Sequence, residues 1–228
     1  MILRRLTRAI AKQDWSAVLL EIVIVVVGVV LGFQVTAWGE ERSERRTERE
    51  LLEGLRSEFA TNRVLFDQSV SDHVTTIDDA RRLLSFTGPE PDGFDEQVID
   101  SLLFAALSVV PSFHPATGEL DAIIGSGQLG LIRNDEIRAS LASWPRVVAL
   151  LRQREAEMRS DILTGFYPYV VERTPLVSMD ASVGFIDVEP SRFDRRYAAL
   201  LSDVAFENHV ENRWFMARSV LQDGEPVD

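Results

Sequence analysis

A run of apolar residues near the N-terminus constrains this chain more than any other feature. The 25 residues between Asp14 and Glu40 carry one charge, Glu21, and the stretch 22–30 contains only Ile, Val and Gly. At roughly 1.5 Å per residue, a helix over residues 16–38 is about 34 Å long, enough to cross a hydrocarbon core of about 30 Å. The sequence therefore predicts one transmembrane helix over residues 16–38.

Two tryptophans bracket this segment, as aromatic side chains do at membrane interfaces. Trp15 precedes the segment and Trp38 ends it, so both are predicted membrane-interface anchors. A cleavable signal peptide is the alternative, because Val35 and Ala37 could form a small-residue cleavage site. The apolar run is longer than a usual signal-peptide core and leads directly into charged residues, which favours a retained signal-anchor.

The charges on the two sides of the segment favour a cytoplasmic N-terminus. The Lys/Arg counts of the flanks tie, but acidic residues dilute the arginines that follow, and the free N-terminus adds positive charge before the span. Residues 1–15 form a basic arm with an apolar helical face, typical of a helix lying on a membrane surface. We therefore expect a single-pass protein of a bacterial inner membrane, with its C-terminal domain in the periplasm.

The composition of the rest of the chain excludes several classes of function. The net charge is −12, and residues 47–228 hold about −14 of it, so this part is a poor partner for nucleic acid. The chain has no cysteine, which excludes disulfides, thiolate metal sites and a cysteine nucleophile. An oxidising compartment such as the periplasm is compatible with that composition.

One face of the predicted span carries a helix–helix interface. Glu21, Val25, Gly28 and Gly32 follow spacings of four, three and four, so they share a helical face. Paired small residues let two helix backbones approach closely, and a carboxyl group in lipid is stabilised by a hydrogen bond across such a pair. We expect a homo-oligomer or pairing with another membrane protein. The alternatives are tolerated glycines with Glu21 reaching toward the interface, or a proton or ion path.

The apolar periodicity beyond the span predicts an all-α protein. Residues 39–50, almost wholly Glu and Arg, predict a charged helical stalk, and residues 51–228 an acidic, irregular helical bundle. The long helix should end near Gly88. Further helices are expected at 95–109 with Asp95 as N-cap, at 117–124 with Thr117 able to cap it, at 134–165 starting from Asn134 or Asp135 with a kink or restart at Pro145, and at 191–221. A possible extended segment lies near 176–190.

Gly125, Gly127 and Gly130 match the G-x-G-x-x-G pattern of dinucleotide sites. That fingerprint requires a preceding strand, a helix that opens at the glycines and an acidic residue after a second strand. The surrounding sequence has none of this context. The three glycines are therefore predicted to form a structural turn between helices, and we expect no cofactor.

The three histidines show no metal-ligand spacing. His73 falls on an apolar stripe and is predicted to be a hydrogen-bonded core residue, whereas His209 is expected on a solvated face. His114 lies near Glu119 and Asp121, and these three residues are a weaker candidate for a cation site. Carboxylates that are adjacent in the sequence point in different directions on a helix. They are therefore expected to be caps and solvated charges and not an acid/base pair.

Two stretches resemble a widespread bacterial family of single-span membrane proteins of unknown function. The first opens on Glu21, closes on Trp38-Gly-Glu-Glu-Arg42 and continues to Leu52, Leu55 and Asn62; the second runs from Gly118 through Ser126-Gly127 to Leu131-Ile132-Arg133-Asn134. Together they cover roughly a third of the chain. The resemblance implies that Glu21 and the glycine turn are family features. It implies no activity, and Trp38-Gly39 departs from the Asn-rich close common in the family.

These features favour a membrane-anchored accessory or scaffold protein over an enzyme, because no catalytic constellation is recognisable. The alternative is an extracytoplasmic sensory or ligand-binding helical module. A pocket with converging polar groups would favour the ligand-binding hypothesis, and a dry core with an exposed apolar patch would favour the scaffold hypothesis.

Overall fold

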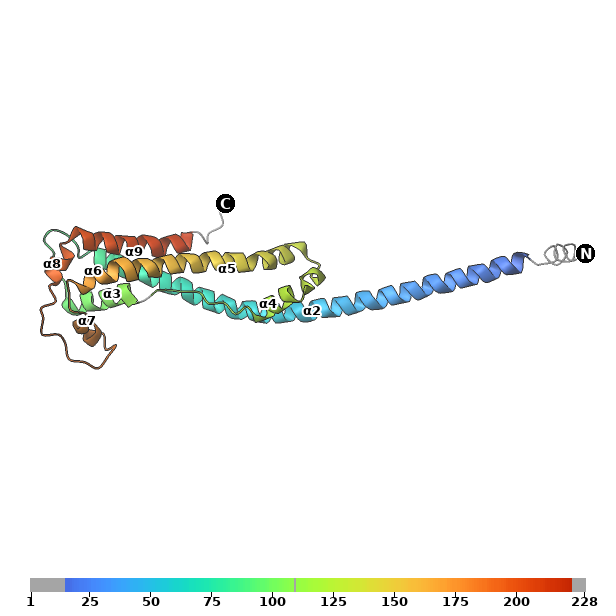
Figure 1. Cartoon of the computed structure of the whole chain (residues 1–228), viewed down its shortest axis with the longest axis horizontal. Coiled ribbons are helices and arrows are strands. Elements are labelled where there is room, and N and C mark those ends of the chain that lie inside the picture. The colour runs from blue at the N-terminus through green and yellow to red at the C-terminus, as the bar shows by residue number, and fades with distance from the viewer. Residues whose placement is uncertain (1–14, 109, 223–228) are drawn as a thin grey trace, which may run out of the picture.

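A computed structural model describes residues 15–108 and 110–222, and all regular secondary structure in these ranges is helical (Figure 1). This confirms the predicted all-α class. The predicted N-terminal arm lies outside the described residues except for Trp15. The elements are α2 (Trp15–Leu84), α3 (Glu96–Ser108), α4 (Gly118–Gly125), the 3-10 helix η1 (Gln128–Leu131), α5 (Asp135–Asp161), the π-helix η2 (Ile162–Phe166), α6 (Tyr167–Val171), α7 (Leu176–Ser182), α8 (Tyr197–Leu201) and α9 (Val204–Gln222).

Helix α2 is an unbroken rod of 70 residues, roughly 105 Å long, that joins the apolar segment to the bundle. Its first part projects away from all other helices (Figure 1). The predicted stalk is helical, and ion pairs between residues four apart support it, with Arg45 at 2.5 Å from Glu41 and Arg46 at 3.0 Å from Glu50. The boundaries of span, stalk and domain therefore fall within one helix, which ends four residues before Gly88.

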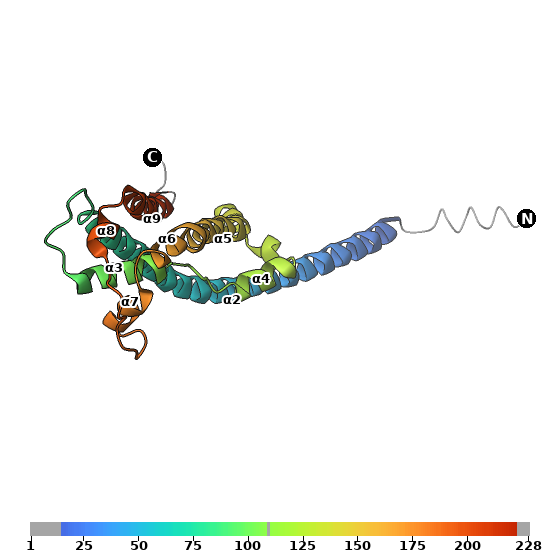
Figure 2. The ribbon, with the colours of Figure 1, turned by 60° about the vertical axis from the view of Figure 1, so that its left-hand side comes forward.

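The largest core cluster lies at the end of the bundle far from the apolar segment. There α3 and α9 pack on the last turns of α2, and α5 runs beside α9 (Figure 2). Full burial of a Leu or Phe side chain contributes roughly 1.5–3 kcal/mol. The cluster includes Leu83, Ile99, Leu103, Phe166, Leu200 and Phe206.

A second cluster lies at the stalk end of the bundle. Leu55 of α2 packs with Leu120 and Ile123 of α4, and Ile132 and Leu141 complete the cluster. The segment 116–134 is thereby held along α2, with its turn at the end of the bundle that faces the apolar segment (Figure 1).

Local signals placed the starts of two helices correctly. Asp95 Oδ1 accepts a hydrogen bond of 2.8 Å from the backbone N–H of Gln97, and Asn134 Oδ1 accepts one of 3.0 Å from that of Ile137. Helix α5 runs through Pro145 without ending, so no restart occurs there. Its axis continues through the π-turn η2 into α6.

The expected extended segment near 176–190 is wrong for its first half, because residues 176–182 form α7. Met179 is buried and Leu176, three residues earlier, packs on the same core cluster, so burial at helical spacing outweighs the β-propensity of Val177. Residues 183–196 contain no strand. Their backbone is tied to the bundle where Thr174 donates a 2.9 Å hydrogen bond to the Arg195 carbonyl.

The predicted helix 191–221 is shorter than expected and divided in two. Helix α8 ends at Leu201 and α9 begins at Val204. Asp203 lies between them, and its carboxylate accepts a 2.9 Å hydrogen bond from the backbone N–H of Ala205. An aspartate that bonds its own downstream backbone in this way starts a new helix instead of continuing the old one.

The three glycines of the fingerprint-like pattern have different backbone roles. Gly125 is the last residue of α4, Gly127 has a φ of 73°, and Gly130 lies within η1. No strand precedes them among the described residues. Only Gly127 occupies the left-handed region that favours glycine, so the structural turn depends on this position.

Replacing Gly127 with alanine should lower the free energy of unfolding by about 1 kcal/mol, because a Cβ strains the left-handed backbone although it would contact no atom within 4 Å. The matched control is Gly125→Ala, whose Cβ also meets nothing within 4 Å but sits on a helical backbone. Thermal unfolding followed by circular dichroism should show a lower melting temperature for Gly127→Ala only. Equal stabilities would contradict the assigned turn.

Candidate functional site

The predicted interface residues of the apolar segment lie exposed on α2. Glu21, Val25, Gly28 and Gly32 contact no other element, and a Cβ added at either glycine would meet no atom within 4 Å. None of the most apolar window is buried within the protein, which distinguishes α2 from a core helix. Helix α2 is therefore long and apolar enough to cross a membrane, and its glycine face is open.

The two predicted interface anchors differ in how far the structure describes them. The Trp38 ring is exposed, and the Arg42 guanidinium lies 5.8 Å from its centroid, within the range of a cation–π contact. The Trp15 side chain lies outside the described part of the chain.

A set of carboxylates on α2 binds the segment that follows α4. Arg133 donates its backbone N–H to Glu48 over 2.7 Å, and its guanidinium lies within 3.5–3.9 Å of Glu41, Glu44 and Glu48. We call these four residues the stalk clasp. Three carboxylates around one arginine form a network, which contributes more to stability than an isolated surface ion pair.

Two further contacts attach the same segment to α2. The carboxylate of Glu58 accepts hydrogen bonds from the backbone N–H groups of Glu119 (2.7 Å) and Leu120 (3.3 Å), at the N-terminus of α4. A negative charge there satisfies orphan donors and favours the helix dipole. The predicted cap, Thr117, makes no such bond. Buried Asn62 exchanges two 2.8 Å hydrogen bonds with the backbone of Ala116.

The stretches that carry the family resemblance therefore lie against each other. Leu55 of the first stretch shares a core cluster with Ile132 of the second, and Glu41 of the first pairs with Arg133 of the second. Asn62 binds Ala116, two residues before the second stretch begins. These residues connect the glycine turn to the stalk. The structure thus gives them an architectural role.

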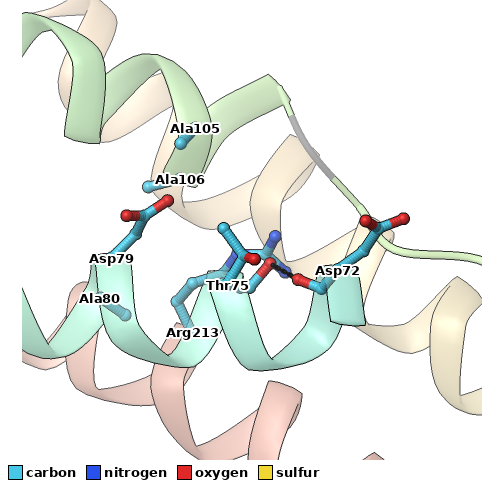
Figure 3. A pocket seen from close by; sticks show the side chains of 8 residues that line it. Asp72, Thr75, Asp79, Ala80, Ala105, Ala106 and Arg213 are labelled. Atoms are coloured by element: carbon cyan, nitrogen blue, oxygen red, sulfur yellow. Dashed lines mark hydrogen bonds between the residues drawn. The ribbon is translucent and has the colours of Figure 1, made fainter. Parts of the chain in front are cut away.

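A pocket of about 90 Å³ opens between α2 and α3, with α9 behind it (Figure 3). Its walls combine acidic, hydroxyl, cationic and small side chains. They belong to Asp72, Thr75, Thr76, Asp79, Ala80, Ala105, Ala106 and Arg213. The polar residues of α2 recur at spacings of three and four, so they share one face, and the two alanines of α3 leave the space open.

Arg213 is the only pocket residue with a positive charge, and it is 1% exposed. Figure 3 shows its guanidinium extending from α9 toward α2, behind Thr75. Burial lowers the pKa of Arg213 to about 10, and Asp161 partly offsets this. The guanidinium therefore keeps its charge at neutral pH.

The α2 wall of the pocket presents hydrogen-bond acceptors. Thr75 donates its hydroxyl hydrogen to the Ser71 carbonyl and Thr76 to that of Asp72, each over 3.0 Å, which leaves both oxygens able only to accept. Asp79 makes no ion pair or hydrogen bond within residues 15–108 and 110–222. Burial raises the pKa of this half-buried carboxyl.

The structure changes the interpretation of two histidines. His73 is buried as predicted, but neither ring nitrogen has a hydrogen-bond partner in the described chain. Burial lowers the pKa of His73, and the nearby charge of Arg213 lowers it further. His209 is half-buried and stacks on Phe166 with ring centroids 5.4 Å apart, so its expected solvated position is wrong.

The candidate cation site is not assembled in the described residues. They contain no group of three His, Asp or Glu side chains placed to hold a metal ion. Glu119 instead lies against Gly54 of α2, where an added Cβ would be 3.1 Å from its Oε2. His114 is exposed.

A second buried polar network has a structural role. Asp100 is fully buried, accepts a hydrogen bond from the Tyr197 hydroxyl and lies 3.3 Å from Arg195, whose guanidinium also binds Glu96 at 2.8 Å. Oδ1 of this buried carboxylate accepts the hydrogen bond, and Oδ2 has the ion pair with Arg195 in place of a hydrogen bond. The network joins α3 to the start of α8 and leaves no side chain directed into a pocket.

The pocket was not predicted, although the sequence of α9 carries a signal for it. Phe206, Val210, Arg213 and Ala217 continue at spacings of four, three and four, so one arginine stands in the apolar stripe of α9. A charge at such a position is rarely buried without a partner or a function. The short residues Ala105 and Ala106 opposite Asp79 complete the pattern, but only the packing of α3 on α2 brings them together.

Comparison with models of protein families, with curated proteins and with solved structures gives no significant match to this chain. The resemblance described above stays a prediction.

The burial of His73 beside Arg213 predicts a loss of stability in acid. The folded state holds the pKa of His73 below its ordinary value of about 6.5, so the unfolded chain binds more protons below that pH. The contribution of His73 is thus complete above pH ~6.5 and is lost as the pH falls toward the lowered folded pKa.

Replacing His73 with leucine should therefore flatten the decline of the melting temperature between neutral pH and about pH 5. A reference measurement near pH 8, where His73 is neutral in both states, separates this effect from packing. Parallel curves for the wild type and His73→Leu would contradict the assignment.

Proposed function

We propose that the protein is a single-pass, membrane-anchored accessory or scaffold protein whose span pairs with a second helix. The observation that supports this most directly is the open face formed by Glu21, Val25, Gly28 and Gly32 on a helix that continues unbroken into the domain. The bundle offers these residues no partner within the described chain, so a partner has to come from another helix.

The chemistry of that face favours pairing in lipid. A carboxyl group among lipid tails costs a few kcal/mol unless it is hydrogen-bonded or reaches the interface. Two glycines four residues apart permit the backbone approach that brings Glu21 against a neighbour. Trp38 and the charged stalk then mark the outer interface.

In this proposal the domain lies in the periplasm of a bacterial inner membrane. The acidic, cysteine-free domain and the diluted positive charge after the span support that orientation. Protease added to spheroplasts should then cut the domain. Cleavage confined to inverted vesicles would reverse the topology.

The continuous helix α2 between span and domain suggests how such a protein acts on a partner. Pairing two spans fixes the positions of two stalks, and the stalk clasp and Glu58 fix the rest of each domain to its stalk. A partner protein bound by the domain is then held at a defined distance from the membrane. This is the behaviour expected of an accessory or scaffold protein.

The alternative is an extracytoplasmic ligand-binding module, and one observation favours it. The polar pocket of α2, α3 and α9 has the converging polar groups that ligand sites use. Because α2 forms a wall of the pocket and also the span, a bound ligand could bias the position of the span through one helix.

Replacing Gly28 with isoleucine should abolish the association signal of residues 12–42 in a transmembrane association reporter, because a branched side chain separates the two backbones. The control is Val29→Ile, which lies about 100° around the helix and should leave the signal unchanged. Replacing Glu21 with glutamine keeps a hydrogen-bonding group and should preserve association. Equal signals from wild type, Gly28→Ile and Val29→Ile would rule out self-association through this face.

A further inference from the structure

The pocket between α2 and α3 separates its charges in a way that specifies a ligand. One cation, Arg213, lies at the back, and one carboxylate without an ion pair in the described chain, Asp79, lies on the α2 wall. Figure 3 shows the Asp79 carboxylate directed toward α3 at Ala106, away from Arg213. The two charges therefore do not neutralise each other directly.

Figure 3 shows the Thr75 side chain beside the Arg213 guanidinium, and the Asp79 carboxylate apart from both. Thr75 and Thr76 can only accept, because the carbonyls of Ser71 and Asp72 hold their hydroxyl hydrogens. The Asp79 carboxylate suits an ammonium group, which has three N–H donors and no acceptor. The Arg213 guanidinium at the back of the pocket suits a carboxylate.

We propose that this pocket binds a small zwitterion, an α-amino acid with a short side chain, whose carboxylate faces Arg213 and whose ammonium faces Asp79. The three alanines of the walls, Ala80, Ala105 and Ala106, contact the carbon atoms.

The volume of the pocket limits the ligand. One water-sized position takes roughly 10–15 Å³ of such space, so 90 Å³ holds about six to nine non-hydrogen atoms. Glycine, alanine and serine fall within this limit, whereas aromatic amino acids do not. A second, wider hollow of about 340 Å³ shares Asp79 and is lined by polar residues that include Arg82, Gln97 and Ser101. It gives a polar approach to the Asp79 side of the pocket.

The inference rests on the pocket that favours the ligand-binding alternative, and not on pairing of the spans. The association reporter and a binding measurement can therefore fail independently. If the zwitterion binds, it bridges α2, α3 and α9 and strengthens the contacts that hold the far end of α2 in the bundle.

The test uses the full chain in lipid nanodiscs with L-alanine as the probe. Propionate and ethylamine are the matched half-ligands, because each keeps one charged group of alanine. We expect millimolar L-alanine to raise the melting temperature in a concentration-dependent way, and each half-ligand to raise it much less. No shift with L-alanine would overturn the proposal, and an equal shift with propionate would show a simple anion site instead.

A pair of neighbouring aspartates supplies the matched variants. Asp79→Asn removes the carboxylate that faces the ammonium and should weaken binding of L-alanine about tenfold or more. Asp78→Asn changes the adjacent residue, which is exposed, pairs with Arg81 at 2.9 Å and lines neither hollow, so it should leave binding unchanged. Equal effects of the two variants would overturn the assigned orientation.

Filling the pocket provides an independent check that does not remove a charge. Ala105→Leu places a larger side chain in the pocket from α3 and should abolish the shift caused by L-alanine. Ala142→Leu makes the same change on the exposed surface of α5 and serves as the control. An undiminished shift in a folded Ala105→Leu variant would place the ligand elsewhere and contradict the proposal.

Discussion

The continuity of α2 is the constraint on which the rest of the structure depends. Each core cluster takes residues from this helix: Leu55 at the stalk end, Ile77 in the middle, and Ala80 and Leu83 at the far end. Helix α5 runs beside α2 and contributes Leu141 and Met158 to two of these clusters, but among the described helices only α2 continues into the apolar segment (Figure 1). Because the same helix carries the apolar segment, the position of that segment is fixed by the packing of α2 in the domain.

The acidity of the domain has a structural use. Much of the backbone of segments 110–117 and 126–134 has no hydrogen-bond partner within regular secondary structure. Buried backbone N–H groups require acceptors. Side chains of neighbouring helices provide them: Glu48 binds the N–H of Arg133, Glu58 caps α4, and Glu155 of α5 accepts a 2.8 Å bond from Phe113. Burial raises the pKa of Glu155, and the bond from Phe113 offsets part of that rise.

The sequence predicted the features that local patterns determine. The apolar run and the apolar periodicity that follows it belong to one continuous helix, so neighbouring residues are enough to predict them. The caps Asp95 and Asn134 lie within three residues of the groups they bind. The features it did not predict depend on distant residues. Helix α7 forms where Leu176 and Met179 meet the core, Glu58 replaces Thr117 as the cap of α4, and the pocket exists only where Ala105 of α3 faces α2.

The central claim, that one rigid helix connects the apolar segment to the domain, can be measured directly. The chain contains no cysteine, so a unique pair of cysteines can be introduced and spin-labelled. Suitable positions are the exposed stalk residue Ser43 and the exposed domain residue Ser71. An unbroken helix places their Cα atoms about 42 Å apart. Pulsed electron–electron double resonance on the full chain in nanodiscs should give one narrow distribution near that distance. A broad distribution, or one centred at a clearly shorter distance, would show a hinge between stalk and domain and contradict the account.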